Sequence, residues 1–391
     1  MTPAAHLETP SGKPRARALG IPFAGVPGPA NAITDVRGLE VGYTTLIDGD
    51  GVRTGVTAIH PRGRNEPGDP VAAGFHSLNG NGEMTGAAWI EESGTTAGPI
   101  AITNTHAVGI AHAGIVRWTA DRHPDLARAW LLPVAAETWD GYLNDINGGH
   151  VTEAHVVAAL DVAESGPIDE GAVGGGTGMC CYQFKAGTGT ASRLVTYGGE
   201  TYAVGVLVQA NFGARHELVI AGTPLGEELA ADNPMDEWSG APAGAGSVIA
   251  IVATDAPLLP GQCKALARRV TLGLARTGTT GSHFSGDLFL AVSTANRGAF
   301  TPGGRAMFEP DSGRLDALRF IPWGYLDDLY AGVAHATEEA VVNALCAGEE
   351  MVGFGGRRAP ALPRELVKAL VGRAGPRLGR ELSPGTRPSG R

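Results

Sequence analysis

Short apolar runs separated by glycine-rich turns recur along the chain and predict β-strands. Residues 32–60 have a strand-like pattern in which an Asp-Gly-Asp-Gly turn at 48–51 separates two apolar runs, an arrangement typical of a β-hairpin. Further short apolar runs cover residues 71–75 and 87–90, and strands are expected over residues 194–209, 218–221, 248–253 and 287–294.

Longer stretches repeat apolar residues at helical spacing and predict helices over residues 105–122, 152–164, 262–276 and 327–346. The last of these begins with Asp327 and Asp328, and two negative charges suit the positive end of a helix dipole. Strands grouped between long helices, without regular β-α-β alternation, predict an α+β layered fold in which helices cover two sheets.

The composition is that of a globular protein with a large core. The chain has 391 residues, of which 43% are apolar and 18% charged, enough for one large domain or two of ordinary size. The formal net charge of −10, without a basic stripe carrying aromatic residues, argues against nucleic acid as a partner. No uninterrupted apolar stretch reaches about 18 residues, so we expect no membrane span.

The ends of the chain and its cysteines give further expectations. Residues 1–30 lack an apolar signal region and are expected to be a flexible leader, and residues 371–391 are expected to be a disordered tail. The four cysteines show no CxxC spacing, which indicates reduced thiols in a cytoplasmic protein. Residues 222–246, rich in Gly, Pro, Ala, Asp and Glu, form the clearest linker.

This linker runs directly into the β-branched run at 248–253, and Ser247 follows Gly246 at the junction. If the Gly246–Ser247 bond is cut, Ser247 carries both a hydroxyl nucleophile and a terminal amine. Such an amine has a pKa of about 7.7–8.0 and can act as a base near neutral pH. The alternative is an ordinary loop that enters a buried strand, because Gly-Ser pairs are common in loops.

Other polar positions fit chemistry at such a junction. Ser285 and Asp287 lie two residues apart at a strand start, so they would share one face and could hold an amine. Asn211 follows a strand and could donate to an oxyanion, and Glu137 follows an apolar run and could bind a substrate ammonium. Turn residues and solvated carboxylates at strand ends are the alternatives.

The sequence lacks the motifs of a metal site, a phosphate-binding loop and a hydrolase triad. His106 and His112 are six residues apart with no carboxylate at ligand spacing, so we expect no metal site. The glycine loop at 174–178 lacks the GKS or GKT ending of a phosphate loop, and Ser247 is not in a GxSxG elbow. The predicted chemistry therefore requires neither a metal nor an organic cofactor.

Several segments together resemble the P1 (DmpA/BapA-like) aminopeptidases, the L-aminopeptidase/D-esterase and β-peptidyl aminopeptidase group. In family order they are 31–42 (NAITDVRGLEVG), 78–86 (LNGNGEMTG), 137–141 (ETWDG), 145–148 (DING), 174–178 (GGGTG), 206–213 (VLVQANFG), 246–247 (GS) and 285–287 (SGD). Each segment alone is weak evidence, but the ordered set, over about residues 20–365, is specific.

The resemblance implies a four-layer αββα sandwich of the N-terminal-nucleophile type, as in DmpA and the ornithine acetyltransferases. It implies autoproteolysis into residues 1–246 and 247–391, whose parts 31–246 and 247–370 would form one catalytic domain. The two subunits would stay associated, and the processed heterodimers would form homo-oligomers, often tetramers.

The resemblance also implies a role for each matching residue. Trp139 departs from the pattern, because some members carry there a Tyr whose hydroxyl helps the oxyanion, and an indole N–H has a different reach. The implied roles are the nucleophile for Ser247, positioning of its amine for Ser285 and Asp287, the oxyanion-hole amide for Asn211, the substrate amine for Glu137, and an aromatic pocket wall for Trp130.

We therefore expect a self-processing serine aminopeptidase or amidase that hydrolyses N-terminal aminoacyl amides, small peptides or esters. One alternative is acyl transfer to an amine on the same fold, as in the ornithine acetyltransferases, which use Thr rather than Ser at the cleavage point. Another is a non-catalytic scaffold, against which the intact set of Ser247, Ser285 and Asp287 argues. The α or β and L or D preference of the substrate stays open.

Overall fold

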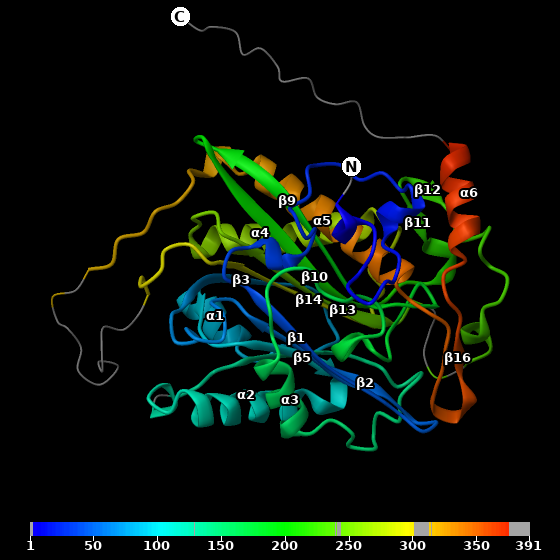
Figure 1. Cartoon of the computed structure of the whole chain (residues 1–391), viewed down its shortest axis with the longest axis horizontal. Helices are drawn as coiled ribbons and strands as arrows, with labels where there is room; N and C mark the ends of the chain where they lie inside the picture. The colour runs from blue at the N-terminus through cyan, green and yellow to red at the C-terminus, as the bar shows by residue number, and fades with distance from the viewer. Residues whose placement is uncertain are drawn as a thin grey trace, which may run out of the picture.

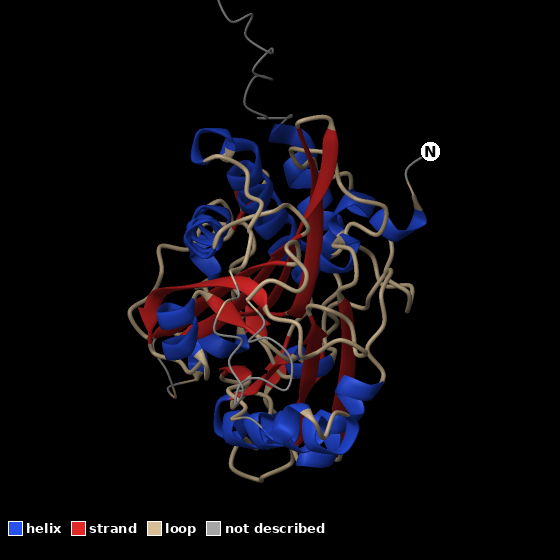
Figure 2. Ribbon diagram, turned by 90° about the vertical axis from the view of Figure 1, so that its left-hand side faces the viewer, coloured by secondary structure: helices blue, strands red, loops and turns tan. Residues whose placement is uncertain are grey.

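Two β-sheets lie face to face at the centre of the molecule, and helices cover both outer faces (Figures 1 and 2). The computed structural model describes residues 3–128, 130–238, 240, 244–300, 313 and 315–374. This arrangement confirms the predicted α+β sandwich of four layers.

The smaller sheet has four strands in the order β1-β2-β5-β6. Helices α2 and α3 pack on its outer face, where Trp118, Ile115 and Val156 join the apolar residues of the sheet in one buried cluster. The bounds of these elements are β1 Glu40–Asp48, β2 Val52–His60, β5 Ile100–Asn104, β6 Val134–Thr138, α2 Val108–Arg122 and α3 Glu153–Asp161.

The larger sheet has six strands in the order β4-β3-β14-β13-β10-β9, and α4 and α5 cover its outer face. Only β13 and β14 are parallel, and the other neighbours are antiparallel. The bounds are β4 Thr95–Thr96, β3 Val71–Gly80, β14 Ser285–Ser293, β13 Gly246–Thr254, β10 Glu200–Asn211, β9 Gly187–Tyr197, α4 Pro260–Ala275 and α5 Asp327–Cys346.

Shorter elements surround this frame. Helix α1 (Ala87–Ser93) precedes β4, and α6 (Arg364–Ala374) is the last described element (Figure 1). Three short hairpins are β7 (Cys180–Cys181) with β8 (Phe184–Lys185), β11 (Val219–Ile220) with β12 (Thr223–Pro224), and β15 (Met351–Val352) with β16 (Arg358–Ala359).

The central strands are buried on both faces, which explains their continuous apolar sequence. In β13, Ile249 and Ile251 point into the core between the sheets, whereas Val248 and Val252 point into the core under the helices. Close helix packing requires glycine in the sheet, because a Cβ on Gly74 of β3 would lie 2.1 Å from the Lys264 nitrogen in α4. The apolar run at 248–253 is thus the centre of the fold.

Most predicted elements are present, with two local differences. The hairpin around residues 48–51 and the helices near 105–122, 152–164, 262–276 and 327–346 are confirmed. The short apolar run at 87–90 belongs to helix α1. The apolar run at 194–209 forms parts of two strands, because Gly198 and Gly199, with φ of 63° and 86°, reverse the chain there.

Residues 3–30 are packed against the domain, which corrects the expectation of a flexible leader. Arg15 is buried and forms an ion pair with Glu170 at 2.8 Å, and it also donates to the carbonyls of Asn31 and Thr190. Ala16 is fully buried in the core under the helices. The polar composition of this segment is typical of a solvated leader, whereas Arg15 and Arg17 pair with Glu170 and Glu339 inside the fold.

At the other end, helix α6 extends to residue 374, past the expected start of the tail at 371. The rest of the predicted tail, 375–391, lies outside the described residues. In the described part of the chain, no helix combines the length and the apolar character needed to cross a membrane.

The buried ion pair of Arg15 provides a test of this packing. Arg15→Met leaves Glu170 buried without its cation, so we expect a loss of about 3–5 kcal/mol in the free energy of unfolding, measured by urea denaturation. The control is Arg37→Met, because Arg37 is 88% exposed and 3.9 Å from Asp255, and its loss should be within about 0.5 kcal/mol. Equal effects of the two substitutions would show that residues 3–30 contribute little to the folded state.

Candidate active site

The candidate residues meet where three strands of the larger sheet end. Ser247 is the second residue of β13 and pairs in register with Asn211, the last residue of β10. On the other side, Gly246 pairs with Ser285 and Val248 with Asp287, at the start of β14. Residues distant in sequence are therefore brought together by strand pairing alone.

Because side chains alternate along a strand, the Ser247 hydroxyl and the Asp287 carboxylate lie on opposite faces of the larger sheet. Val248 packs under the helices, so its in-register partner Asp287 points to the same face. Ser247 points to the other face, where its Oγ accepts a hydrogen bond from the Trp139 N–H at 3.2 Å. The Ser247 nitrogen lies between the hydroxyl on one face and the carboxylate on the other.

Ser247 itself is 2% exposed and follows Gly246 in a continuous chain. No larger residue fits before it, because a Cβ on Gly246 would lie 1.9 Å from the Asn211 carbonyl oxygen. The glycine therefore allows the junction to enter the strand beside Asn211.

Asp287 accepts hydrogen bonds at both carboxylate oxygens. The Ser285 hydroxyl donates to Oδ1 at 2.5 Å, and the Asn79 amide donates to Oδ2 at 2.9 Å. Burial raises the pKa of Asp287 above its usual value, and hydrogen bonds from Ser285, Asn79 and the Val248 backbone oppose that rise. Among the described residues no cation pairs with this buried carboxylate, which suits the arrival of an amine.

The Asn211 side chain is held at both ends. Its Oδ1 accepts a hydrogen bond from the Cys180 N–H at 3.0 Å, and its Nδ2 donates to the Trp139 carbonyl at 2.8 Å. An amide nitrogen has two hydrogens, so one N–H of Nδ2 remains to serve a ligand in the adjoining cavity. Asn211 and Ser247 line the same cavity, and the Trp139 N–H already donates to the Ser247 hydroxyl.

Glu137 lies at the end of β6, in the smaller sheet, and is 2% exposed. The Glu83 N–H donates to its Oε1 at 2.8 Å, and the Thr105 hydroxyl donates to its Oε2. Burial raises its pKa, and no cation pairs with it among the residues that the structure describes. Like Asp287, it is a buried carboxylate that a positively charged ligand group could pair with.

A cavity of about 530 Å³ lies beside the candidate residues. Glu137, Asn211 and Ser247 line it, and no lysine or arginine does so in the described part of the chain. Its apolar wall is aromatic, since Trp238 stacks on Trp139 with ring centroids 5.6 Å apart. The remaining large apolar lining residues are Tyr142, Phe212, Met235 and Phe284.

Trp130, to which the resemblance gave the aromatic wall of the pocket, is not among the residues that line this cavity. It lies before the start of β6, whereas Glu137 and Trp139 lie at the end of that strand, and it is 61% exposed. Strand β6 begins at Val134, so Trp130 lies outside it. Trp238, from the segment 222–246, supplies an aromatic side chain of the cavity lining.

The structure brings together Ser247, Ser285, Asp287, Asn211, Glu137 and Trp139, and it adds residues that the sequence alone did not identify. Asn79, Thr105 and Trp238 contact the predicted residues directly. Asn79 lies in the Asn- and Gly-rich segment at 78–86, one of the segments on which the family resemblance rests. Nothing in the pattern around Thr105 or Trp238 distinguished them from a helix cap and a linker residue.

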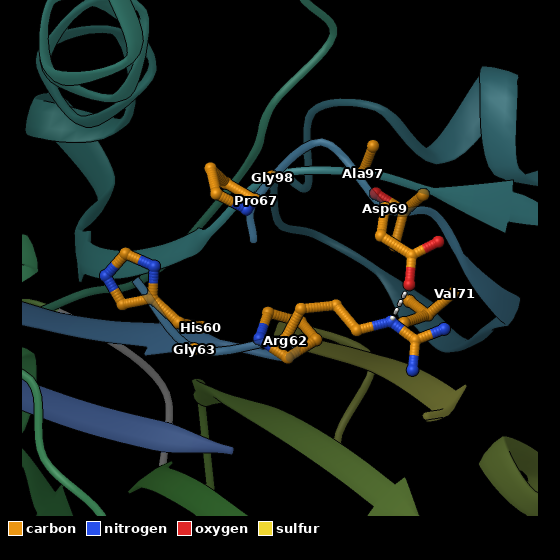
Figure 3. A pocket seen from close by; sticks show the side chains of 10 residues that line it. His60, Arg62, Gly63, Pro67, Asp69, Val71, Ala97 and Gly98 are labelled. Atoms are coloured by element: carbon orange, nitrogen blue, oxygen red, sulfur yellow. Dashed lines mark ion pairs between the residues drawn. The ribbon is translucent and has the colours of Figure 1, made fainter. Parts of the chain in front are cut away.

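A second hollow, lined by His60, Arg62 and Asp69, is structural (Figure 3). Arg62 pairs with Asp69 at 3.1 Å and donates to the Pro70 carbonyl at 3.1 Å. Burial lowers the pKa of His60 to about 4, so this ring is neutral and holds the Leu160 carbonyl. The ionic groups here satisfy one another, unlike those beside Ser247.

Asp140, next to Trp139, is the most strongly perturbed carboxyl near the site. It is fully buried, and burial raises its pKa to about 7. Its Oδ1 accepts from the Asn144 amide at 3.1 Å, whereas its Oδ2 accepts no hydrogen bond. The protonated form therefore suits this environment, and it fixes the turn that carries the Trp139 amide.

Comparisons with known sequences agree with this geometry. Residues 31–359 match the sequence profile of peptidase family S58. The β-peptidyl aminopeptidase BapA of Sphingosinicella microcystinivorans is 47% identical over 376 residues, which is 92% of this chain and 92% of that protein. The β-peptidyl aminopeptidase BapA of Sphingosinicella xenopeptidilytica is 44% identical over 379 residues, 92% of this chain and 91% of that protein.

Solved structures give the same result for the fold. The L-aminopeptidase D-Ala-esterase/amidase of Ochrobactrum anthropi superposes with a TM-score of 0.85 at 46% identity, covering 93% of this chain and 99% of that one. That protein is described as a prototype of the serine aminopeptidases and a variant of the Ntn hydrolase fold. A Burkholderia sp. β-aminopeptidase gives a TM-score of 0.82 at 42% identity, covering 92% and 99%. The predicted N-terminal-nucleophile fold is thereby confirmed.

The raised pKa of Asp140 predicts a pH dependence of stability. Because the native state keeps this proton up to about pH 7 and the unfolded chain loses it near pH 4, stability falls as the pH rises between these values. Asp140→Asn cannot ionise and removes this fall. Relative to the wild type, the variant should gain about 2–3 kcal/mol between pH 5 and pH 8, measured as unfolding free energies at the two pH values.

The control for this experiment is Asp125→Asn, because the Asp125 side chain is 93% exposed. Its stability should follow the wild type at both pH values. A difference between wild type and Asp140→Asn that does not change with pH would contradict the assignment of a native proton to Asp140.

Proposed function

The chain belongs to peptidase family S58 and is a serine aminopeptidase with the Ntn hydrolase fold, and on that basis we propose that Ser247 is its nucleophile, released by cleavage of the Gly246–Ser247 bond. The observation that carries this proposal is the strand register. It surrounds the Ser247 nitrogen and hydroxyl with Asn211, Ser285, Asp287 and the Trp139 N–H.

We propose that the first reaction of the chain is on itself. The Ser247 Oγ attacks the Gly246 carbonyl carbon, the C–N bond breaks, and the acyl group passes from nitrogen to oxygen as an ester. Water then hydrolyses this ester, which leaves a carboxylate on Gly246 and a free amine on Ser247. The uncut chain of this structure corresponds to the state before that reaction, with the nitrogen still in a peptide bond.

In the processed enzyme, the Ser247 amine is the base for its own hydroxyl. The amine accepts the Oγ proton as Oγ attacks the carbonyl of an N-terminal aminoacyl group, and it later returns the proton to the leaving amine. Asp287, held by Ser285 and Asn79, lies on the face away from the hydroxyl. This position supports a role on the amine rather than on Oγ itself.

Asn211 is the proposed oxyanion donor, through the N–H of Nδ2 that Trp139 does not use. A donor of this kind typically contributes about 3–4 kcal/mol to transition-state stabilisation. The Trp139 backbone N–H is placed to help, because it already contacts Oγ. The Trp139 indole stacks on Trp238, so we assign it to the wall of the substrate pocket.

Glu137 is the proposed site for the free ammonium of the substrate. Its burial without a cation, and the absence of lysine and arginine from the described cavity lining, support this role. The substrates that fit are small peptides and aminoacyl amides or esters with a free N-terminus and an apolar acyl group. The named activities of the relatives, β-peptidyl aminopeptidase and L-aminopeptidase D-Ala-esterase/amidase, are consistent with this class.

We further propose that the two products of cleavage stay together as one catalytic domain of residues 31–246 and 247–370. In the larger sheet, the strands β14 and β13 of the second product lie side by side between β3 and β10 of the first product. We also keep the expectation of a homo-oligomer of processed heterodimers, as a tetramer, in the cytoplasm. All four cysteines are free and buried, which supports a reducing compartment.

Self-cleavage is tested by denaturing electrophoresis and N-terminal sequencing. The wild-type chain should give two fragments, the smaller beginning Ser-Val-Ile-Ala, and Ser247→Ala should remain one chain without aminopeptidase activity. Ser282→Ala, a nearby substitution whose side chain makes none of these contacts, should be processed normally. A wild-type chain that stays whole while it hydrolyses aminoacyl amides would overturn the proposal.

The role of Glu137 is tested by comparing substrates with free and acetylated N-termini. Glu137→Gln removes the charge from a buried carboxylate, so kcat/KM for the free amine should fall about 30-fold to 1000-fold, and the preference over the acetylated substrate should be lost. Glu83→Gln is the control, because it removes a neighbouring negative charge but keeps the backbone N–H that donates to Glu137. If Glu137→Gln keeps the preference for a free amine, another group binds the ammonium.

A further inference from the structure

A buried lysine lies behind the candidate oxyanion amide. Lys185, in the short hairpin of β7 and β8, is 0% exposed. Its Nζ donates to the carbonyls of Met179 at 2.9 Å and Ala186 at 2.6 Å, and at 3.4 Å to that of Gly176. No carboxylate pairs with it among the described residues, so its charge is balanced by carbonyl dipoles alone.

The contacts of Lys185 require its protonated form. Three carbonyl oxygens surround Nζ, and only an ammonium has three N–H donors, since a neutral amine has two. Burial lowers its pKa to about 8, and the titratable groups that face it are the Cys180 thiol and, farther off, the Lys13 ammonium. At neutral pH the group is therefore a buried cation.

One peptide unit links this cation to Asn211. Lys185 donates to the Met179 carbonyl, and the N–H of the same peptide, on Cys180, donates to the Asn211 Oδ1 at 3.0 Å. A charge at one end of a hydrogen-bond chain polarises each following bond, most strongly in a low-dielectric interior. The series runs from the ammonium through the 179–180 peptide and the Asn211 amide to the Nδ2 hydrogen that faces the cavity.

The hairpin that carries Lys185 is rigid. Lys185 pairs in register with Cys180, and the two residues between the strands, Tyr182 and Gln183, have φ of 50° and 58°. Arg215 holds both carbonyls of this turn, donating to that of Tyr182 at 2.9 Å and to that of Gln183 at 2.5 Å. The ammonium and the Cys180 N–H therefore keep a defined relation to Asn211.

We propose that Lys185 is a positioning residue for the oxyanion hole, which orients and polarises the Asn211 amide through the 179–180 peptide. The inference rests on the proposed role of Asn211. Lys185 touches no substrate, so its loss should affect the transition state rather than substrate binding. Its effect should also disappear when Asn211 is absent.

The test is a double-mutant cycle on the full chain, with rates expressed per processed molecule. Lys185→Met should lower kcat about tenfold to 100-fold, with KM changed less than about threefold. In the Asn211→Ala background the same substitution should lower kcat less than about threefold, because the group through which it acts is gone. Thr177→Val is the matched control, since it removes a buried donor to Gly174 in the same loop without touching the 179–180 peptide.

A second measurement needs no substitution at Lys185 and covers the case in which Lys185→Met does not fold. The kcat of the wild type should fall as the pH rises above about 8, where Lys185 loses its proton, whereas Asn211→Ala should lack this alkaline fall. An alkaline fall of equal size in both proteins would overturn the inference.

The outcomes separate this inference from the proposed function. If Asn211→Ala leaves kcat unchanged, the oxyanion role of Asn211 fails, and the inference fails with it. If Asn211→Ala lowers kcat, the proposed function stands. Lys185 is then only structural if Lys185→Met lowers kcat equally in both backgrounds, lowers it no more than Thr177→Val does, or raises only KM.

Discussion

The register of β13 between β10 and β14 is the constraint on which the site depends. It sets Ser247 opposite Asn211 on one side and the start of β14 on the other. A slip of one residue would turn every side chain of β13 to the opposite face and would carry Ile249 and Ile251 out of the core between the sheets. The apolar core that stabilises the fold therefore also fixes which face the Ser247 hydroxyl occupies.

This coupling explains which parts could be predicted from the sequence. The spacing of Ser285 and Asp287 along one strand is local, and strand geometry alone predicts that the two side chains share a face. The helix at 327–346 is also a local pattern, with apolar residues at helical spacing and acidic residues at its start. For the contacts between distant segments, the ordered family segments supplied what periodicity could not.

What could not be predicted depends on contacts across long stretches of chain. The contact of Asn79 with Asp287 joins residues 208 positions apart, and Trp238 reaches Trp139 from a segment with the composition of a linker. Arg15 looked like part of a solvated leader because its partner Glu170 lies 155 residues away. The position of Trp130 outside β6 could not be predicted either, because an apolar run does not show where its strand begins.

The electrostatics of the site differ from those of the rest of the interior. Elsewhere, buried carboxylates such as Glu339 pair with cations, in this case Arg17 and Arg193. Beside the cavity, Asp287 and Glu137 have no cation partner among the residues that the structure describes, and burial raises the pKa of each.

Leaving a carboxylate in this condition costs stability, and the proposed chemistry supplies the missing charges at two different times. In the proposed reaction, cleavage would place an amine next to Asp287, and substrate binding would bring an ammonium to Glu137. Each positive charge would favour the ionised carboxylate and lower its pKa. On this proposal, processing followed by substrate binding would complete the ion pairs that folding leaves open.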